Sequence, residues 1–328
     1  MDFPCEIATV GANDRPMAKH WGCPLRSVDV VSARSVEELF SEQRRSAYNS
    51  WVGGGDPSVI GRQNASIILE ATKPKNNSTL LDFGCGMGRT VSGILEKRND
   101  LSIVGLDIIP ELIEFCNQQI ASRFPNTLFH CTSASHPLYK GIESISGFRV
   151  EDEEELTKRY EDSFDTAVAF SVFTHLNSEM ATRCLEQIRR MIKRTGTLVL
   201  TVFLLDAFSR KQVSTGNAYK MASKAAAKKR FYSSDEKHRF TAFDTNEFAE
   251  ILHAAGFVID LIGYGHWRGK KPTEIGGTLQ DWIVARPISS LPEQFDPMRY
   301  LVLNPLLPKD IDPVEHYLRH GYYEYRRY

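Results

Sequence analysis

Apolar residues along the chain follow two patterns, short continuous runs and longer segments with helical periodicity. The runs at residues 79–83 and 101–106 are typical of buried strands, whereas residues 35–48 and 57–72 have the periodicity of helices. Further along the chain, strand-like runs alternate with helical segments, and this alternation predicts an α/β fold with a mostly parallel sheet.

A glycine-rich turn joins the first strand-like run to a helical segment. Gly84, Gly86 and Gly88 follow Asp82 at intervals of two residues. Glycine adopts a positive φ without strain and lets a ligand approach the backbone, while the amides at the start of the following helix stay open. Asp107 ends the second run, a position from which a carboxylate accepts hydrogen bonds from both hydroxyls of a ribose. These residues predict a nucleoside pocket.

The glycine spacing separates two kinds of nucleoside ligand. A dinucleotide fingerprint has its third glycine three residues after the second, whereas Gly88 follows Gly86 by two. Asp82 would also lie close to a bound pyrophosphate, and like charges at short range in a partly buried cleft are costly. The pocket is therefore expected to hold a ligand without phosphate.

On these residues the chain resembles the class I S-adenosylmethionine-dependent methyltransferases. Segments 164–176, 196–203, 240–257 and 265–282 are similar, in order, to that family's fourth strand and turn, fifth strand, last helix with its strand, and closing hairpin. The resemblance implies a Rossmann-like, seven-stranded, mostly parallel sheet with helices on both faces.

The resemblance also implies S-adenosylmethionine as cofactor, with S-adenosylhomocysteine as product. The glycine loop would contact the methionyl part, Asp82 its ammonium and Asp107 the ribose. The adenine would meet Ile108 and the turn after the third strand, where the acidic residue of many relatives is absent. The implied cofactor-binding residues are Asp82, Gly84, Cys85, Gly86, Gly88, Asp107, Ile108, Thr132, Ser133 and Ser171.

Methyl transfer to a hydroxyl group calls for a general base, and histidine serves this role near neutral pH. His175 is the first candidate because it follows the fourth strand, although the same position can simply anchor the turn. His136 and His238 are further candidates, and either could instead be an ordinary loop residue. No metal is predicted, since the acids of 244–247 are typical of a capping box at a helix start.

The chain divides into a core with additions before, within and after it. Residues 1–77 are expected to form an N-terminal helical cap, 78–287 the core and 288–328 a C-terminal helical tail. In the cap, glycines 53–55 form either a hinge or loop over the ligand, or a surface turn.

Two segments inside the core carry concentrated charge. An insertion at 139–162 contains the acidic run 151–155, expected to be a solvated helix face, with partner binding as the alternative. A basic segment at 207–238 is either a lid that recognises an anionic substrate or an exposed helix whose lysines give solubility.

The tail resembles a short helical module at the ends of bacterial glycosyltransferases and other cell-surface polysaccharide proteins. This resemblance implies a link to polysaccharide biosynthesis. Its tyrosine-rich amphipathic segments would dock a protein partner or pack on the core.

Composition limits the alternatives. The chain has 328 residues, of which 42% are hydrophobic and 25% charged, with a formal net charge of −1. No global charge attracts it to nucleic acid or membrane, and no apolar run approaches the roughly 20 residues that span a bilayer. Six scattered cysteines indicate neither a disulfide framework nor a zinc site. A cytoplasmic location is expected.

The leading functional hypothesis is O-methylation of a carbohydrate or related small hydroxylated acceptor. A second enzymatic hypothesis keeps the fold and changes the acceptor to a natural-product phenol, an amine or a protein side chain. A third treats the chain as a regulatory or partner protein that binds the cofactor without turnover.

Overall fold

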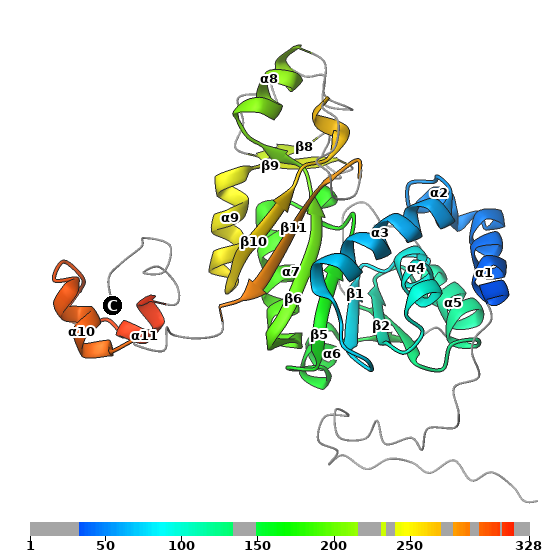
Figure 1. The fold of residues 1–328 in the computed structure, drawn as a ribbon, viewed down its shortest axis with the longest axis horizontal. Coiled ribbons are helices and arrows are strands. Elements are labelled where there is room, and N and C mark those ends of the chain that lie inside the picture. Colours follow the sequence, from blue (N-terminus) through cyan, green and yellow to red (C-terminus); the bar gives the residue numbers. More distant parts are fainter. Residues whose placement is uncertain are drawn as a thin grey trace, which may run out of the picture.

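A twisted sheet with helices packed on both faces forms the centre of the protein (Figure 1). The computed structural model describes residues 33–133, 149–215, 231–233, 240–269, 278–288, 295–308 and 310–317. Within these ranges, no helix has both the length and the apolar character that a membrane crossing would require.

Eight strands build the main sheet, in the order β10-β11-β6-β5-β1-β2-β3-β4. Only β11 runs against its neighbours, pairing antiparallel with both β6 and β10. The Rossmann-like, mostly parallel sheet with helices on both faces is thus confirmed. The strands are β1 (Thr79–Phe83), β2 (Ser102–Asp107), β3 (Thr127–Thr132), β4 (Val150–Glu151), β5 (Phe164–Ala169), β6 (Ile192–Val202), β10 (Phe257–Gly263) and β11 (Asp281–Pro287).

The predicted number of seven strands is wrong by one. The additional strand is β4, which lies at the sheet edge and pairs with the end of β3 through Cys131↔Val150 and Thr132↔Glu151. Two residues are too few to show a periodic pattern, so the sequence held no signal for a strand in this insertion.

The helices cover the sheet in two layers. One face carries α1 (Ala33–Arg45), α3 (Pro57–Thr72), α4 (Arg89–Lys97) and α5 (Pro110–Cys116), which continues into a π-helical turn, η2 (Asn117–Ala121). The other carries α6 (Glu153–Arg159), α7 (Ser178–Met191) and α9 (Thr245–Ala254). A separate apolar cluster lies on each face, so both sides of the sheet are buried, as expected for parallel strands.

Side-chain caps fix where several of these helices begin. Asp56 accepts a hydrogen bond from the amide of Ser58 at the start of α3, where Pro57 is the first helical residue. Asp244 accepts from the amides of Asn246 and Glu247 at the start of α9, which confirms the predicted helix start.

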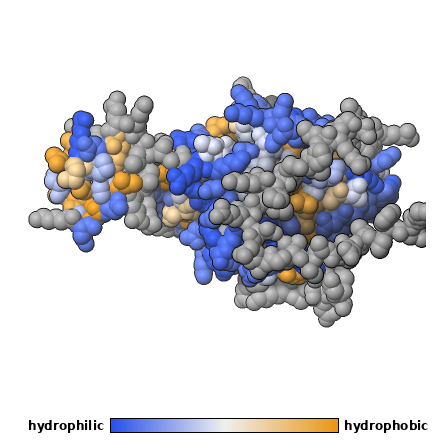
Figure 2. Space-filling view, turned by 90° about the horizontal axis from the view of Figure 1, so that it is seen from below, coloured by the Kyte–Doolittle hydropathy of each residue, from blue (hydrophilic) through white to orange (hydrophobic). Residues whose placement is uncertain are grey.

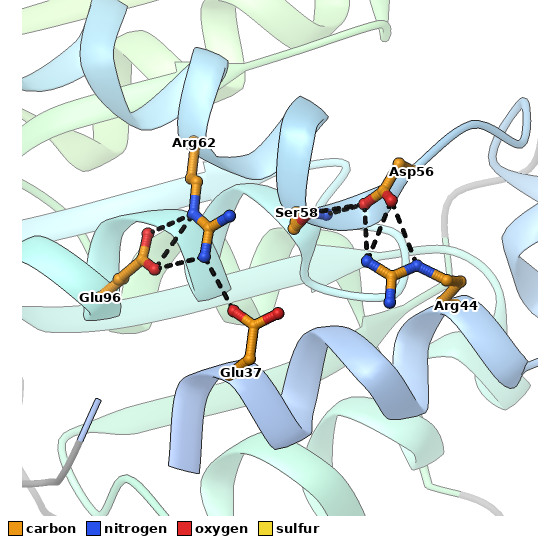
Figure 3. A network of polar contacts seen from close by, with 6 residues as sticks. All are labelled: Glu37, Arg44, Asp56, Ser58, Arg62 and Glu96. Atoms are coloured by element: carbon orange, nitrogen blue, oxygen red, sulfur yellow. Dashed lines mark hydrogen bonds and ion pairs between the residues drawn. The ribbon is translucent and has the colours of Figure 1, made fainter. Parts of the chain in front are cut away.

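The cap helices are tied to the core by exposed ion pairs (Figure 3). Arg62 of α3 binds Glu96 of α4 at 2.7 Å and Glu37 of α1 at 2.8 Å. Arg44 of α1 binds Asp56, the residue that caps α3. Exposed pairs contribute little stability each, but these link three helices in a fixed arrangement.

A second, three-stranded sheet stands above the carboxyl end of β6. It consists of β7 (Leu204–Leu205), β9 (Thr241–Asp244) and β8 (Phe231–Ser233), in the order β7-β9-β8, beside α8 (Ala207–Thr215) (Figure 1). Of the basic segment, Arg210 forms an ion pair with Asp244 at 2.6 Å. Lys220, Lys224 and the basic residues at 228–230 lie outside the described residues.

Asp281, at the start of β11, connects the two sheets. It is fully buried and accepts hydrogen bonds from the amides of Leu204 and Gly265 and from the indole of Trp267. Burial raises the pKa of Asp281 to about 7. One side chain therefore holds both the connection between β10 and β11 and the first strand of the second sheet, β7.

The tail contains two short helices, α10 (Pro297–Leu303) and α11 (Pro313–His316), which stand apart from the sheet in Figure 1. Tyr300 is buried, and its hydroxyl lies 2.8 Å from Nδ1 of His316. Met298, Val302, Leu303 and Leu306 are exposed, and Figure 2 shows hydrophobic atoms at this end of the molecule. The resemblance to a polysaccharide-associated module stays a prediction.

Candidate active site

A cavity of about 590 Å³ opens at the carboxyl ends of the parallel strands. This is the edge at which open α/β sheets bind their ligands. Its walls include the segments that follow β1, β2, β3, β5 and β6, the cap residues 50–54, and residues 278–280 ahead of β11.

The glycine loop after β1 fits between two other segments of the wall. Gly84 has a φ of +75°, and a Cβ there would lie 2.4 Å from Cγ2 of Val172 in the turn after β5. Gly86 has a φ of +54°, and a Cβ there would lie 3.0 Å from Cγ1 of Val52 in the cap. Glycine is needed at both positions because of the backbone angle and because the neighbours pack closely.

The backbone amides of this loop are largely occupied inside the protein. Those of Gly84 and Cys85 donate to the carbonyl of Leu106 at 2.8 and 2.9 Å, and that of Gly88 donates to Cys85 at 2.9 Å. The loop is therefore rigidly attached to β2. These three amides are not open to a ligand, whereas the expectation from the sequence concerned the amides at the start of the following helix.

Asp107 ends β2 and lines the cavity. Its carboxylate accepts hydrogen bonds from the amide of Gly86 at 2.7 Å and from that of Ile109 at 3.0 Å. Burial raises the pKa of Asp107, and these backbone donors oppose that rise. A carboxylate has about four acceptor positions, so it can still accept hydrogen bonds from a ligand.

Asp82 lies on β1 behind the cavity wall and is 1% exposed. One of its carboxylate oxygens has no hydrogen-bond partner. Burial, followed by the charge of Asp107, raises the pKa of Asp82 to about 7. No described lysine or arginine compensates either carboxylate.

The cavity brings together most of the predicted site residues that the structure describes. Asp82, Gly88 and Ser133 lie outside its lining, and Ser133 instead accepts a hydrogen bond from the amide of Glu153 at 3.3 Å. His136 and His238 lie outside the described residues. The predicted residues that line the cavity are Gly84, Cys85, Gly86, Asp107, Ile108, Thr132, Ser171 and His175.

His175 belongs to a short 3-10 helix after β5, η4 (Phe173–His175), and is half-buried in the cavity wall. Its amide donates to the carbonyl of Val172 at 3.0 Å, which closes the turn after β5. Its side chain is within the cavity lining and its backbone is part of the turn, so both interpretations of this residue stay open.

The cap forms part of the cavity wall. The sequence had left open whether its glycine run lies over the ligand or in a surface turn. Gly53 and Gly54 line the cavity, so this glycine run lies over the site and is not a remote surface turn. Arg89, the first residue of α4, donates to the carbonyl of Gly54 at 2.9 Å and to that of Val52 at 2.6 Å. Sequence reasoning missed Arg89, although its place directly after Gly88 was a usable signal.

Glu153 is a second residue that the sequence did not single out. It opens α6, belongs to the acidic run 151–155, and lines the same cavity as Thr132. Glu151 of that run is also not solvated, because it binds Arg159 and His130, both at 2.6 Å. The acidic run is therefore only partly the solvated helix face that was predicted.

Ser171 and Gln280 form a polar pair in the wall. Ser171 has a φ of 60°, an unfavourable angle for a residue other than glycine, and its amide donates to Oγ1 of Thr201 at 2.7 Å. Nε2 of Gln280 lies 2.9 Å from the hydroxyl of Ser171. Strained backbone of this kind gathers at functional sites.

Aromatic side chains contribute an apolar part of the cavity. Phe203 stacks on Phe240 with ring centroids 4.3 Å apart, and both line the cavity, as does the half-exposed Trp51 of the cap helix α2 (Tyr48–Trp51). In the part of the chain that the structure describes, no cluster of three potential metal ligands is found.

Comparison with known proteins finds a family model that is similar to part of the chain. Residues 81–198 match the family model described as a methyltransferase domain. The fold is similar to a protein of Pyrococcus horikoshii, PH0226, with 13% identity, a TM-score of 0.46, and coverage of 75% of this chain and 98% of that one.

A second similar structure is the 1,6-didemethyltoxoflavin-N1-methyltransferase of Burkholderia thailandensis, at 16% identity and a TM-score of 0.43, covering 85% of this chain and 94% of that one. A third is a TehB-like SAM-dependent methyltransferase of Corynebacterium glutamicum, at 17% identity and a TM-score of 0.41, covering 78% and 100%. Because these likenesses are distant, the fold assignment rests on the strand order of this chain. The stretch that matches the family model, residues 81–198, contains the glycine loop and Asp107.

Proposed function

We propose that the protein is an S-adenosylmethionine-dependent methyltransferase. The observation that carries this proposal is the pair of buried carboxylates, Asp82 and Asp107, on the neighbouring strands β1 and β2. Neither is paired with a described cation, and each is penalised by burial. Charges in such a position favour a ligand with positive charge of its own.

S-adenosylmethionine meets these demands. Its ammonium and sulfonium are cationic, and its ribose hydroxyls can donate to Asp107. A pyrophosphate would be repelled by both carboxylates and would find the amides of Gly84, Cys85 and Gly88 already bonded. The methyltransferase match over residues 81–198 supports the same ligand.

The adenine is assigned to the side of the cavity between Ile108 and Thr132. Ile108 would cover one face of the ring, and Thr132 and Ser133 would approach its edge. Glu153 lines the same cavity, and its carboxylate can accept a hydrogen bond from an exocyclic amine. This side chain would take the place of the acid that the turn after β3 lacks.

The reaction proposed is in-line transfer of a methyl group to a nucleophile. The bound cofactor supplies a methyl group on a positively charged sulfur. The protein holds the acceptor in line and excludes water, and this positioning supplies much of the rate. His175 would take the proton of a hydroxyl acceptor. Ser171 and Gln280 would orient the acceptor through hydrogen bonds.

The acceptor proposed is a carbohydrate or a related small molecule with hydroxyl groups. The resemblance of the tail to polysaccharide-associated modules supports it, and the Ser171–Gln280 pair offers donors and acceptors for hydroxyls. The tail would then contact a protein partner through its exposed residues Met298 and Val302.

One observation favours a second acceptor class. Phe203, Phe240 and Trp51 give the cavity an aromatic side, which suits a planar phenol of the natural-product type. Sugar rings also pack on aromatic faces, so the two classes must be separated by experiment.

The experiment is incubation of the protein with S-adenosylmethionine labelled on the methyl group. Parallel reactions contain nucleotide sugars and oligosaccharides, simple phenols, amines, or denatured protein. Label in saccharide supports the leading proposal, and label in a phenol, an amine or a protein supports the second enzymatic hypothesis. Tight cofactor binding without transfer supports a binding protein, and failure to bind the cofactor refutes the proposal altogether.

A further inference from the structure

Arg89 is the one lysine or arginine among the described residues that line the cavity. It is half-buried at the start of α4, directly after the glycine loop. A guanidinium offers five donors, and two of them go to the carbonyls of Val52 and Gly54. Arg89 lines the cavity, and three donors of its guanidinium take no part in these two bonds.

No described carboxylate pairs with this guanidinium. Burial alone lowers the pKa of Arg89 to about 10, so no nearby negative charge compensates the cost of desolvation. Two other arginines of low exposure do have acidic partners, Arg268 with Asp206 and Arg210 with Asp244. Buried charges are normally paired, and a cation left alone in a cavity wall indicates an anionic ligand.

Four amides of the glycine loop cannot take this role. The amides of Gly84, Cys85 and Gly88 donate to backbone carbonyls, and that of Gly86 donates to Asp107. An anionic group of the ligand therefore finds its strongest donor in Arg89, whose planar fork matches a carboxylate.

We propose that Arg89 binds the carboxylate of the amino-acid part of the cofactor. Because Arg89 also donates to the carbonyls of Val52 and Gly54, the bound carboxylate and the cap are then held by the same side chain. The proposal rests on the proposed function, because it names the residue that recognises one group of the same ligand. The cavity wall then has the acidic Asp107, with Asp82 behind it, and the cationic Arg89, an arrangement that fits a zwitterionic ligand.

This assignment makes a prediction about ligand selectivity. A nucleoside that lacks the amino-acid part, 5′-methylthioadenosine, has no carboxylate for Arg89 but keeps the ribose for Asp107. If Arg89 only holds the cap, its loss should weaken the binding of both ligands equally. If Arg89 contacts the carboxylate, its loss should weaken the binding of S-adenosylhomocysteine alone.

The test is calorimetric titration of the full chain with S-adenosylhomocysteine and with 5′-methylthioadenosine. We expect Arg89→Gln to weaken S-adenosylhomocysteine roughly 10- to 100-fold and to leave 5′-methylthioadenosine within about twofold, since a charge-assisted hydrogen bond is lost in the first case only. Asp107→Ala should weaken both ligands. Arg44→Gln, which removes a cap ion pair away from the cavity, should weaken neither more than about twofold.

Several results would overturn the inference. Equal losses for both ligands in Arg89→Gln would show that the residue only anchors the cap, and unchanged binding of S-adenosylhomocysteine would show that it does not meet the ligand. If Arg89→Gln does not fold, Arg89→Lys decides, with an expected loss of roughly 3- to 10-fold for S-adenosylhomocysteine alone, because the charge stays but the fork is lost. Wild-type protein that binds neither ligand would refute the proposed function itself.

Discussion

Asp82→Asn should make the stability of the ligand-free protein less sensitive to pH between about pH 4 and pH 7. Asp82 is buried, and its pKa rises from the usual 3.8 to about 7. Between these two values the unfolded chain releases a proton that the folded protein keeps. The folded state therefore loses stability as the pH rises from about 4 to about 7, and above that range the loss stays constant.

The size of the loss follows from the two pKa values. Each pKa unit corresponds to about 1.4 kcal/mol, so the difference of about three units amounts to about 4 kcal/mol at full ionisation, as an upper limit. Asparagine has nearly the same shape and no charge. Its presence should remove this part of the pH dependence and leave the packing around β1 intact.

The assay is urea unfolding of both proteins, without ligand, at intervals between pH 4.5 and 8.5. The free energy of unfolding of Asp82→Asn minus that of the wild type should grow with pH and level off above about pH 7. Asp281 also has a raised pKa of about 7, but it is present in both proteins and cancels in the difference. Parallel curves for the two proteins would refute the reasoning, since they would mean that Asp82 is ionised in the fold without cost.

Three further changes test the site and the cap. Asp107→Ala should weaken S-adenosylhomocysteine binding by roughly 1–3 kcal/mol in calorimetry, because ribose hydroxyls lose their acceptor; unchanged affinity would contradict the assignment. Gly84→Ala should lower stability by roughly 1–3 kcal/mol in urea unfolding, because its Cβ would lie 2.4 Å from Val172. Adding Val172→Ala should recover part of that loss, and no recovery would place the strain in the backbone. Arg62→Ala should change the unfolding free energy by less than about 1 kcal/mol, since its ion pairs are exposed, and a larger loss would show that the network in Figure 3 acts as a unit.

The sequence predicted those parts of the fold whose pattern is local. Residues 79–83 and 57–72 form the expected strand and helix with the expected limits, because a full apolar run or several helical turns lie within each. Strands of two to four residues, such as β4, β7 and β9, show no period and were not predicted. Their pairing depends on where longer elements have already placed them.

The site was predictable to the extent that it follows the strand ends. Asp107, Ile108 and Ser171 lie in the cavity wall because they end β2 or follow β2 and β5. Arg89 and Glu153 were missed, since their roles depend on the cap and on the insertion folding back over the sheet. The occupied loop amides were also unforeseeable, because their acceptor is a carbonyl of another strand.

Much of the cavity wall is contributed by residues outside the stretch that matches the methyltransferase family. The segment 50–54 precedes that stretch, and Phe203, Phe240 and Gln280 follow it. A fragment cut to residues 81–198 would thus keep the recognisable signature but leave its ligand open to water on two sides. We therefore expect differences in ligand selectivity to arise from the segments before and after residues 81–198, which the family model does not cover.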